Sequence, residues 1–379
     1  MSVLNAIRLS RAPILPFATM GAGWGTFAAY VPEIKAGLAV GDGAFGALLL
    51  FSSLGLLTSM WVAPRLDDLL HRMALPVAAG LLGMAFLLPG LATVPVFFAL
   101  AMVCLGAASG LTDVVMNARV SELEARHRLS LMNVNHAMFS FAYAAAAVVC
   151  SFTREAGVPA ISVLIGVTVF SLSLTPLMRG KIPVDAAEPA EGRFPTGVVI
   201  WGGLIVMVGF LIENAMEGWS ALHIERTLGG VAAQGALGPA VLGLTMGIGR
   251  LSGQVVAGRW PEEPVLVVAA VLAGAGLVVA GLAPGPAMAY VGFAMAGLGV
   301  SVIAPMALAL IGRRVSNRAR TRAIARASVI GFMGFLIGPT LVGGLSELAG
   351  LRAAFICVAV FALSVPPLLW LMRSGSGAS

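Results

Sequence analysis

The stretch RGKIPVDAAEPAEGRFPT, from Arg179 to Thr196, is the longest polar break in this chain of 379 residues. It holds three prolines and six charged residues. Apolar segments of about 20 residues lie on both sides of it, and that is the length a helix needs to cross a bilayer. We therefore interpret residues 179–196 as a linker between two membrane-embedded halves.

Apolar residues dominate the whole chain, with 59% hydrophobic and only 11% charged residues. A soluble core of this size could not bury so many, so the backbone polar groups must be satisfied within transmembrane helices. Strands fail as an alternative because the segments are too long and lack strict alternation. We predict an all-α membrane protein whose twelve spans are residues 11–32, 43–63, 73–92, 94–117, 131–152, 157–178, 196–216, 234–257, 265–283, 287–311, 323–346 and 351–372.

The second half repeats the first at a shift of 194 residues. VAPRLDDLLHR after the second span corresponds to VAGRWPEE after the eighth, which aligns Arg65 with Arg259 and Asp68 with Glu262. Two repeats with a substrate path between them are typical of secondary transporters. We predict six-helix bundles at residues 1–178 and 197–379, joined by the cytoplasmic linker 179–196.

The basic residues fix the expected orientation. With a cytoplasmic N-terminus, 19 of the 23 lysines and arginines fall on the cytoplasmic side, and only Lys35, Arg154, Arg226 and Arg352 fall outside. This asymmetry follows the positive-inside rule and places both termini in the cytoplasm. The net charge of +6 then reflects membrane topology, and we expect no nucleic-acid partner.

The chain lacks the local signatures of an enzyme. It contains no phosphate-binding Walker loop, no metal-binding His/Glu pair and no nucleophile elbow. Cys104, Cys150 and Cys357 fall within or at the ends of spans with a spacing that suits no metal. We expect no enzymatic activity, no cofactor and no metal, so transport is either driven by an ion gradient or passive.

Several stretches resemble the major facilitator superfamily over nearly the whole chain. They are GAGWGTFAAYVPEIKAGL from Gly21, GLTDVVMNAR from Gly110, ENAMEGWSA from Glu213, MGIGRLSG from Met246 and GFLIGP from Gly334. They look most like a bacterial subfamily of inner-membrane permeases that is distantly similar to fucose–proton symporters. The resemblance implies two six-helix bundles and transport by alternating access.

The loop after the second span is similar to the superfamily's cytoplasmic signature, although Ala63 or Pro64 stands where a glycine is usual. The resemblance implies that acidic and basic residues here latch the two halves together. With its counterpart in the second repeat, this predicts a cytoplasmic latch of Arg65, Asp67, Asp68, Arg72 and Arg259.

Asp113 is the clearest ionisable residue within a span, and such residues are functional candidates because they are costly in a membrane. Asn117 lies one turn further on the same helix face, and Asn133 and His136 share a face of the next helix. We predict an Asp113–Asn117–Asn133–His136 cluster, in which Asp113 and His136 couple protons and the two asparagines bind substrate. The alternatives are an Asp113 that holds a nearby arginine, and a neutral, hydrogen-bonded His136.

A second candidate cluster lies on spans seven and eight. Glu213 and Glu217 are four residues apart and share a helix face, while Arg250 lies deep in span eight. We expect Glu213 to bind protons or substrate, and Glu217 and Arg250 to bind substrate. Glu213 should lie near the outer end of its helix and Arg250 near the inner end of the next. A separation of about 15 Å, at about 1.5 Å per residue, would rule out a direct salt bridge. Arg250 could instead reach the cytoplasmic surface, and Glu217 could be solvated.

Trp24 lies in the middle of span one, which lines the path in the fold that the chain resembles. It could stack on a substrate or pack in the core. We predict a monomeric, proton-coupled transporter of a small, polar or sugar-like solute in the inner membrane, in contact with lipids. Efflux of amphipathic compounds is the alternative. A lipid-handling or scaffold protein is the alternative of another class.

Overall fold

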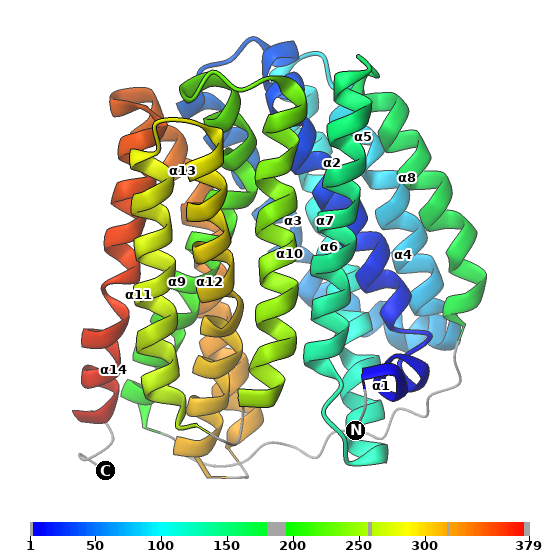
Figure 1. Ribbon diagram of the computed structural model, residues 1–379. Helices are drawn as coiled ribbons and strands as arrows, with labels where there is room; N and C mark the ends of the chain where they lie inside the picture. Colours follow the sequence, from blue (N-terminus) through cyan, green and yellow to red (C-terminus); the bar gives the residue numbers. More distant parts are fainter. Residues whose placement is uncertain (1–2, 180–194, 257–259, 317–318, 375–379) are drawn as a thin grey trace.

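The computed structural model describes residues 3–179, 195–256, 260–316 and 319–374, which are almost entirely helical (Figure 1). The N-terminal half, residues 3–179, contains α1 (Val3–Leu9), α2 (Ile14–Leu38), α3 (Asp42–Leu70), η1 (His71–Met73), α4 (Ala74–Ala85), α5 (Leu87–Leu91), α6 (Pro95–His127), α7 (Met132–Glu155), α8 (Ala160–Leu174) and η2 (Thr175–Met178). The C-terminal half, residues 195–374, contains α9 (Thr196–Leu222), η3 (His223–Thr227), α10 (Ala232–Val256), α11 (Glu262–Leu282), α12 (Pro286–Arg314), α13 (Arg320–Ala362) and α14 (Val365–Ser374).

The prediction of an all-α membrane protein with twelve spans is confirmed. Eight helical segments in the described residues are long and apolar enough to cross a membrane. Two of these, Asp42–Leu91 and Arg322–Arg373, contain two spans each. The 25-residue helices α2 and α10 supply the other two spans. The eleventh and twelfth spans meet at Gly350, whose φ of 80° breaks the helix inside α13.

Span seven is longer than predicted. The helix that begins at Thr196 runs through Leu222 and continues as the π-helical turn η3 to Thr227, whereas the predicted span stops at residue 216. The two glutamates on this helix resemble a polar end in the sequence, but the helix continues beyond them, and Arg250 of α10 pairs with the first, Glu213. This extension changes the depth of Glu213, as described below.

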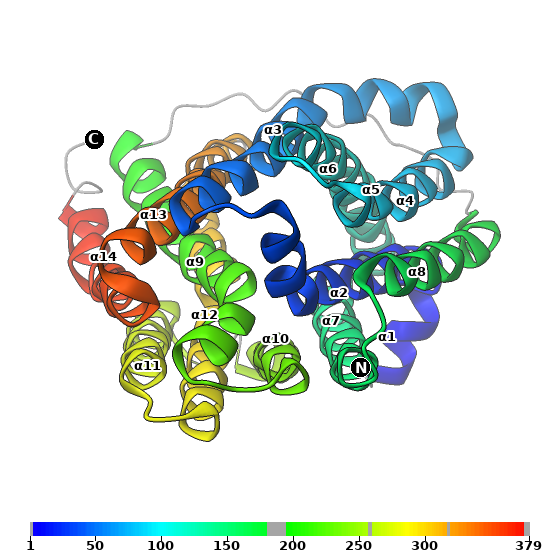
Figure 2. The ribbon, with the colours of Figure 1, turned by 90° about the horizontal axis from the view of Figure 1, so that it is seen from above.

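The two halves meet along two pairs of helices. α10 packs against α7 and α13 packs against α3, and Figure 2 shows both pairs side by side. Glycines permit this close approach. A Cβ on Gly46 of α3 would lie 2.3 Å from the carbonyl oxygen of Pro339, and one on Gly243 of α10 would lie 2.6 Å from the Tyr143 ring. The predicted linker 179–196 stays a prediction, because residues 180–194 lie outside the described part of the chain.

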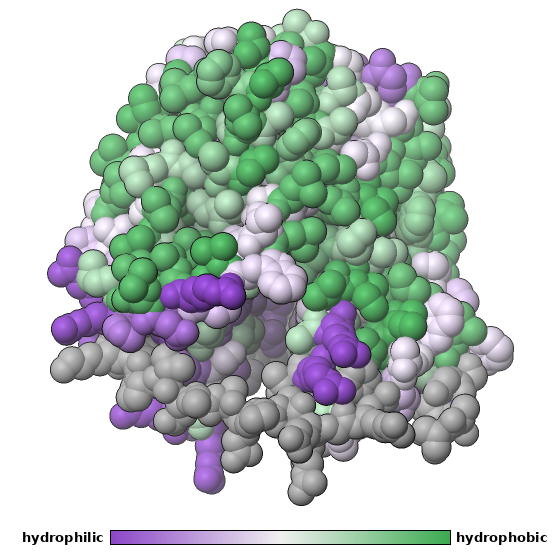
Figure 3. Space-filling model, turned by 180° about the vertical axis from the view of Figure 1, so that it is seen from behind, coloured by the Kyte–Doolittle hydropathy of each residue, from purple (hydrophilic) through white to green (hydrophobic). Residues whose placement is uncertain are grey.

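Both chain ends lie at the same end of the bundle, as an even number of spans requires (Figure 1). We call this end the terminal face and the other end, which holds Asp42 and Arg226, the opposite face. Apolar side chains cover the flank between them, and hydrophilic residues gather at the terminal face (Figure 3). Phe97 and Phe152 are each 67% exposed, which suits contact with lipid rather than water. Figure 3 also shows a recess between the two halves at the terminal face.

Candidate functional site

An ion pair at the centre of the bundle joins three helices. Arg250 of α10 donates from Nη2 to Glu213 Oε1 of α9 at 3.0 Å. Its Nη1 donates to the Ser140 hydroxyl of α7, and to the His136 carbonyl oxygen at 3.4 Å. Glu213 is only 8% exposed, so its charge is almost fully shielded from water. Arg250 thus links the C-terminal half to the N-terminal half at membrane depth.

The prediction that Glu213 and Arg250 lie too far apart for a salt bridge is wrong. Because α9 continues through η3 to Thr227, Glu213 lies 14 residues before the end of the span rather than near it. Arg250 lies 18 residues after Ala232, the start of α10. The heights of the two residues in these antiparallel helices therefore differ by only about 6 Å, at about 1.5 Å per residue. The long arginine side chain spans that difference.

Glu217 lies one turn beyond Glu213 on the same face of α9, and its side chain is half-buried. Electrostatic interactions link Glu217 to Glu213 and Arg250. Tyr143 of α7 interacts electrostatically with both glutamates and is 2% exposed. Ser140 and Tyr143 were not predicted as site residues, because neither stands out in the sequence from the other small and aromatic residues of span five.

The predicted four-residue cluster around Asp113 does not form. Asn117 Nδ2 donates to Asp113 Oδ1 at 2.9 Å, but no hydrogen bond among the described residues joins Asp113 to Asn133 or His136. The reason is topological: α6 packs mainly on α3 and α4, whereas α7 packs on α2 and α10. The His136 ring instead contacts Phe17 edge-on, with 4.9 Å between ring centroids.

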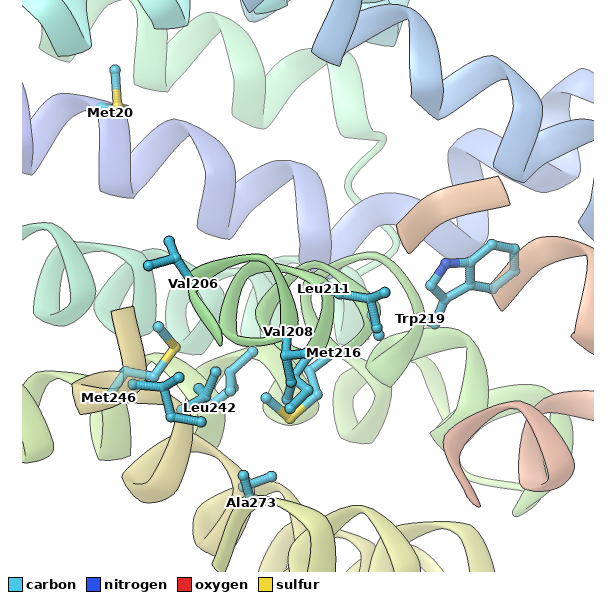
Figure 4. Packing of buried hydrophobic residues seen from close by; sticks show 14 of the residues in the cluster. Met20, Val206, Val208, Leu211, Met216, Trp219, Leu242, Met246 and Ala273 are labelled. Carbon is cyan, nitrogen blue, oxygen red and sulfur yellow. The ribbon is translucent and has the colours of Figure 1, made fainter. Parts of the chain in front are cut away.

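Trp24 is half-buried in α2 and makes edge contacts with two rings, Phe27 at 5.6 Å and Phe86 at 5.7 Å. Trp219 of α9 lies at the contact between helices of the two halves. It is fully buried, packs edge-on against Phe45 of α3 at 5.9 Å and lies among the core residues in Figure 4. It therefore belongs to the contact between the two halves.

Two of the residues predicted to form a latch, Arg65 and Asp67, make contacts within the N-terminal half. Asp67 of α3 forms a salt bridge with Arg119 of α6, and Arg65 donates to the Trp61 carbonyl oxygen of its own helix at 2.8 Å. Asp68 and Arg72 are exposed, and Arg259 lies outside the described residues.

The C-terminal half contains a similar salt bridge, in which Arg313 of α12 pairs with Glu262 at 2.7 Å. Arg313 follows Arg119 by 194 residues, and Glu262 follows Asp68 by the same shift. The two arginines therefore occupy equivalent positions in the repeat, whereas Asp67, the acid of the N-terminal pair, lies one residue before the position equivalent to Glu262.

A network of hydrogen bonds and ion pairs that was not predicted from the sequence closes the opposite face. Asp42 begins α3 and accepts hydrogen bonds from Arg226 at 2.5 and 3.0 Å, and from the Ser346 hydroxyl at 2.5 Å. Lys35 adds an ion pair with Asp42 at 2.9 Å. From α13, Glu347 Oε2 accepts the backbone N–H of Asp42 at 2.6 Å. These contacts join the N-terminal half to η3 and α13.

A second ion pair completes the closure of the opposite face. Arg154 of α7 pairs with Glu225 of η3, with 3.2 Å between Nη2 and Oε2. Three of the four basic residues predicted for this face therefore bind acids, and Arg352 instead donates to the carbonyl oxygens of Gly281 and Ala283. One feature of the sequence could have predicted these ion pairs. Few cations are assigned to this face, and the same face also carries the acids Asp42 and Glu225.

Within the described residues, no group of three or more histidine, cysteine, aspartate or glutamate side chains could hold a metal ion. The polar groups at the centre of the bundle are instead one cation, two carboxylates and neutral donors. They can bind a polar solute or a proton, and they lie between two halves that are joined on the opposite face.

Comparisons with known proteins show that the chain is similar to membrane transporters. A sequence model described as the Major Facilitator Superfamily matches residues 219–378. An uncharacterized MFS-type transporter from Yersinia pestis is 28% identical over 355 residues, covering 93% of this chain and 92% of that protein. Membrane protein MosC from Rhizobium meliloti is 26% identical over 347 residues, covering 89% and 83%.

Solved structures show the same fold. An inward-facing, unoccupied bacterial homolog of the human lysosomal transporter Spinster has a TM-score of 0.74 at 13% identity, covering 99% of this chain and 98% of that one. The E. coli fucose:proton symporter has a TM-score of 0.63 at 14% identity, covering 98% and 99%. A D-xylose-proton symporter has a TM-score of 0.71 at 15% identity, covering 96% and 97%.

Proposed function

Because this chain is a distant member of the major facilitator superfamily of transporters, we propose that it moves a small polar solute across the inner membrane together with protons. The observation that carries the proposal is the contact of Arg250 with Glu213 and Ser140. This contact joins the two halves at membrane depth. A charge there costs free energy, so an ionisable residue within a span usually has a functional role. The fold resemblance to fucose and D-xylose symporters supports a polar solute and proton coupling.

In this proposal, transport proceeds by alternating access. The ion pairs of Asp42 and Arg154 hold the opposite face closed, and the recess at the terminal face is the route by which a solute would approach the central site from the cytoplasm (Figure 3). Rocking of the halves would break these pairs and expose the site to the other side. Arg250 is suited to sense the solute, because it touches residues of both halves and can exchange partners.

The proposed roles of the central residues follow from their charge and placement. Asp113, His136 and Glu213 are the candidates for proton binding. Trp24, Asn117, Asn133, Glu217 and Arg250 are the candidates for solute contacts. Arg65, Asp67, Asp68, Arg72 and Arg259 remain the candidates for a cytoplasmic latch that forms when the terminal face closes.

Proton coupling can be tested by replacing Asp113 with asparagine, which mimics the protonated acid. In this variant we expect no accumulation of solute driven by the proton gradient. Exchange of solute across the proteoliposome membrane should remain at least partly intact. Solutes are first found by thermal-shift screening of the purified protein, and uptake is then measured after a pH jump. Unchanged dependence of uptake on the pH gradient in Asp113→Asn would remove Asp113 from the mechanism.

We also propose that the terminal face is cytoplasmic, because 19 of the 23 basic residues are assigned to that side. Tags added at the N-terminus and the C-terminus of separate variants should both resist a membrane-impermeant label in intact cells. Both should react once the membrane is permeabilised. Labelling of either tag in intact cells would contradict this orientation.

A further inference from the structure

The charges at the central site do not balance. The carboxylate of Glu213 is paired with Arg250, whereas Glu217 is close enough to both to interact electrostatically. Within the described part of the chain, no hydrogen bond reaches the Glu217 side chain, although it is half-buried. Two carboxylates therefore face the single Arg250 guanidinium, which leaves one negative charge without a partner. A low-dielectric environment makes such a charge costly unless a cation joins it.

A second polar group beside Glu217 also lacks a partner. The Tyr143 hydroxyl is buried and forms no hydrogen bond with any described residue, although the residue is only 2% exposed. Its ring is held against α10, where a Cβ on Gly243 would lie 2.6 Å from Cδ1. Its strongest electrostatic neighbour is Glu217. Buried hydroxyls are normally hydrogen-bonded, so the Tyr143 hydroxyl is free to form a hydrogen bond with a polar group of a solute.

Glu217 and Tyr143 lie at the same depth. Tyr143 is three residues beyond Ser140 on α7, and Glu217 is four residues beyond Glu213 on α9. Both helices run from the terminal face to the opposite face, so both steps lead one turn deeper than the Arg250 contact. A solute that enters from the terminal face therefore meets Arg250 first and this pair last.

We propose that Glu217 and Tyr143 form a subsite for a protonated amino group of the transported solute. An ammonium group carries three donors and one positive charge, so it can satisfy the Glu217 carboxylate and the Tyr143 oxygen together. It also restores charge balance beside the Glu213–Arg250 pair. This inference rests on the proposed transport function and adds the chemical class of the solute. A neutral polyol would supply donors but no charge.

The first test compares solutes that differ only in the amine. Thermal-shift assays on the purified full-length protein use glucosamine, glucose and N-acetylglucosamine, together with ethanolamine and ethylene glycol. We expect an amine to stabilise the protein at concentrations at least about tenfold lower than its uncharged counterpart, as the loss of a charged hydrogen bond implies. If no amine in this set is preferred over its counterpart, the proposal is overturned.

The second test assigns the preference to this subsite. Glu217→Gln should remove the preference for the amine, Glu217→Asp should retain it, and Tyr143→Phe should weaken amine binding by about threefold. Glu155→Gln is a matched control, because Glu155 is exposed at the end of α7. An unchanged preference in Glu217→Gln would place the amine elsewhere and overturn the proposal.

Uptake into proteoliposomes separates this inference from the proposed function. Binding of an amine through Glu217 without uptake would support the subsite and contradict transport of that solute. Proton-driven uptake of a neutral solute that is lost in Glu217→Gln would support transport and overturn the subsite. In that case the charge that balances Glu217 is a proton.

Discussion

Replacing Arg250 with methionine is expected to abolish uptake and to lower the free energy of unfolding by about 3–5 kcal/mol, because one partner of a buried ion pair is removed. Glu213 would remain at 8% exposure without its cation, and Ser140 would lose its donor across the two halves. The two readouts are solute uptake into proteoliposomes and denaturation of the purified protein. Arg126→Met is the control, because Arg126 is exposed near the end of α6 on the terminal face.

The double variant Arg250→Met with Glu213→Gln separates stability from function. Removing both charges eliminates the unpaired carboxylate, so most of the lost stability should return. Uptake should not return, because the link between α10 and α7 is still absent. Arg250→Lys keeps the charge but loses the planar fork that contacts Glu213 and Ser140 together, so its uptake should remain low. Uptake by the double variant at the wild-type rate would show that the ion pair is only structural.

Asp42→Asn is expected to open the opposite face. Asp42 accepts from Arg226 and Ser346 and pairs with Lys35, and the neutral amide cannot replace these charge-assisted interactions. Loss of even one such bond should shift the ratio of open to closed molecules by at least about tenfold. Spin labels at Val94 and Leu282 report the opening as a longer distance, after the three native cysteines have been replaced.

Glu155→Gln is the matched control for this experiment. It makes the same change from carboxylate to amide on the opposite face, where Glu155 is exposed at the end of α7. The distance distribution between the labels should stay that of the wild type. If Asp42→Asn also leaves the distribution unchanged, the ion pairs do not set the conformational equilibrium. The pair between Arg154 and Glu225 could then be removed in the same background to test whether it alone keeps the face closed.

The candidate site was only partly accessible to sequence reasoning. Glu213, Glu217 and Arg250 were identified because ionisable residues within apolar segments are rare and therefore conspicuous. Their partnership was missed because the acids on span seven resemble the end of a helix. The extension through η3 depends on contacts with other helices, which hydropathy does not report. Tyr143 and Ser140 were missed because only the packing of α7 on α10 brings them to the charges.

The sequence by itself determined the helical class, the twelve spans and the repeat at 194 residues. Hydropathy and composition are local properties of the chain, and they decide which segments can cross a bilayer as helices. Only the tertiary structure decided which charges meet. Asp42 and Glu347 are 305 residues apart in the chain, and Asp42 and Arg226 are 184 residues apart. Such contacts depend on how two bundles of helices pack, and the separation of residues along the chain carries no information about that packing.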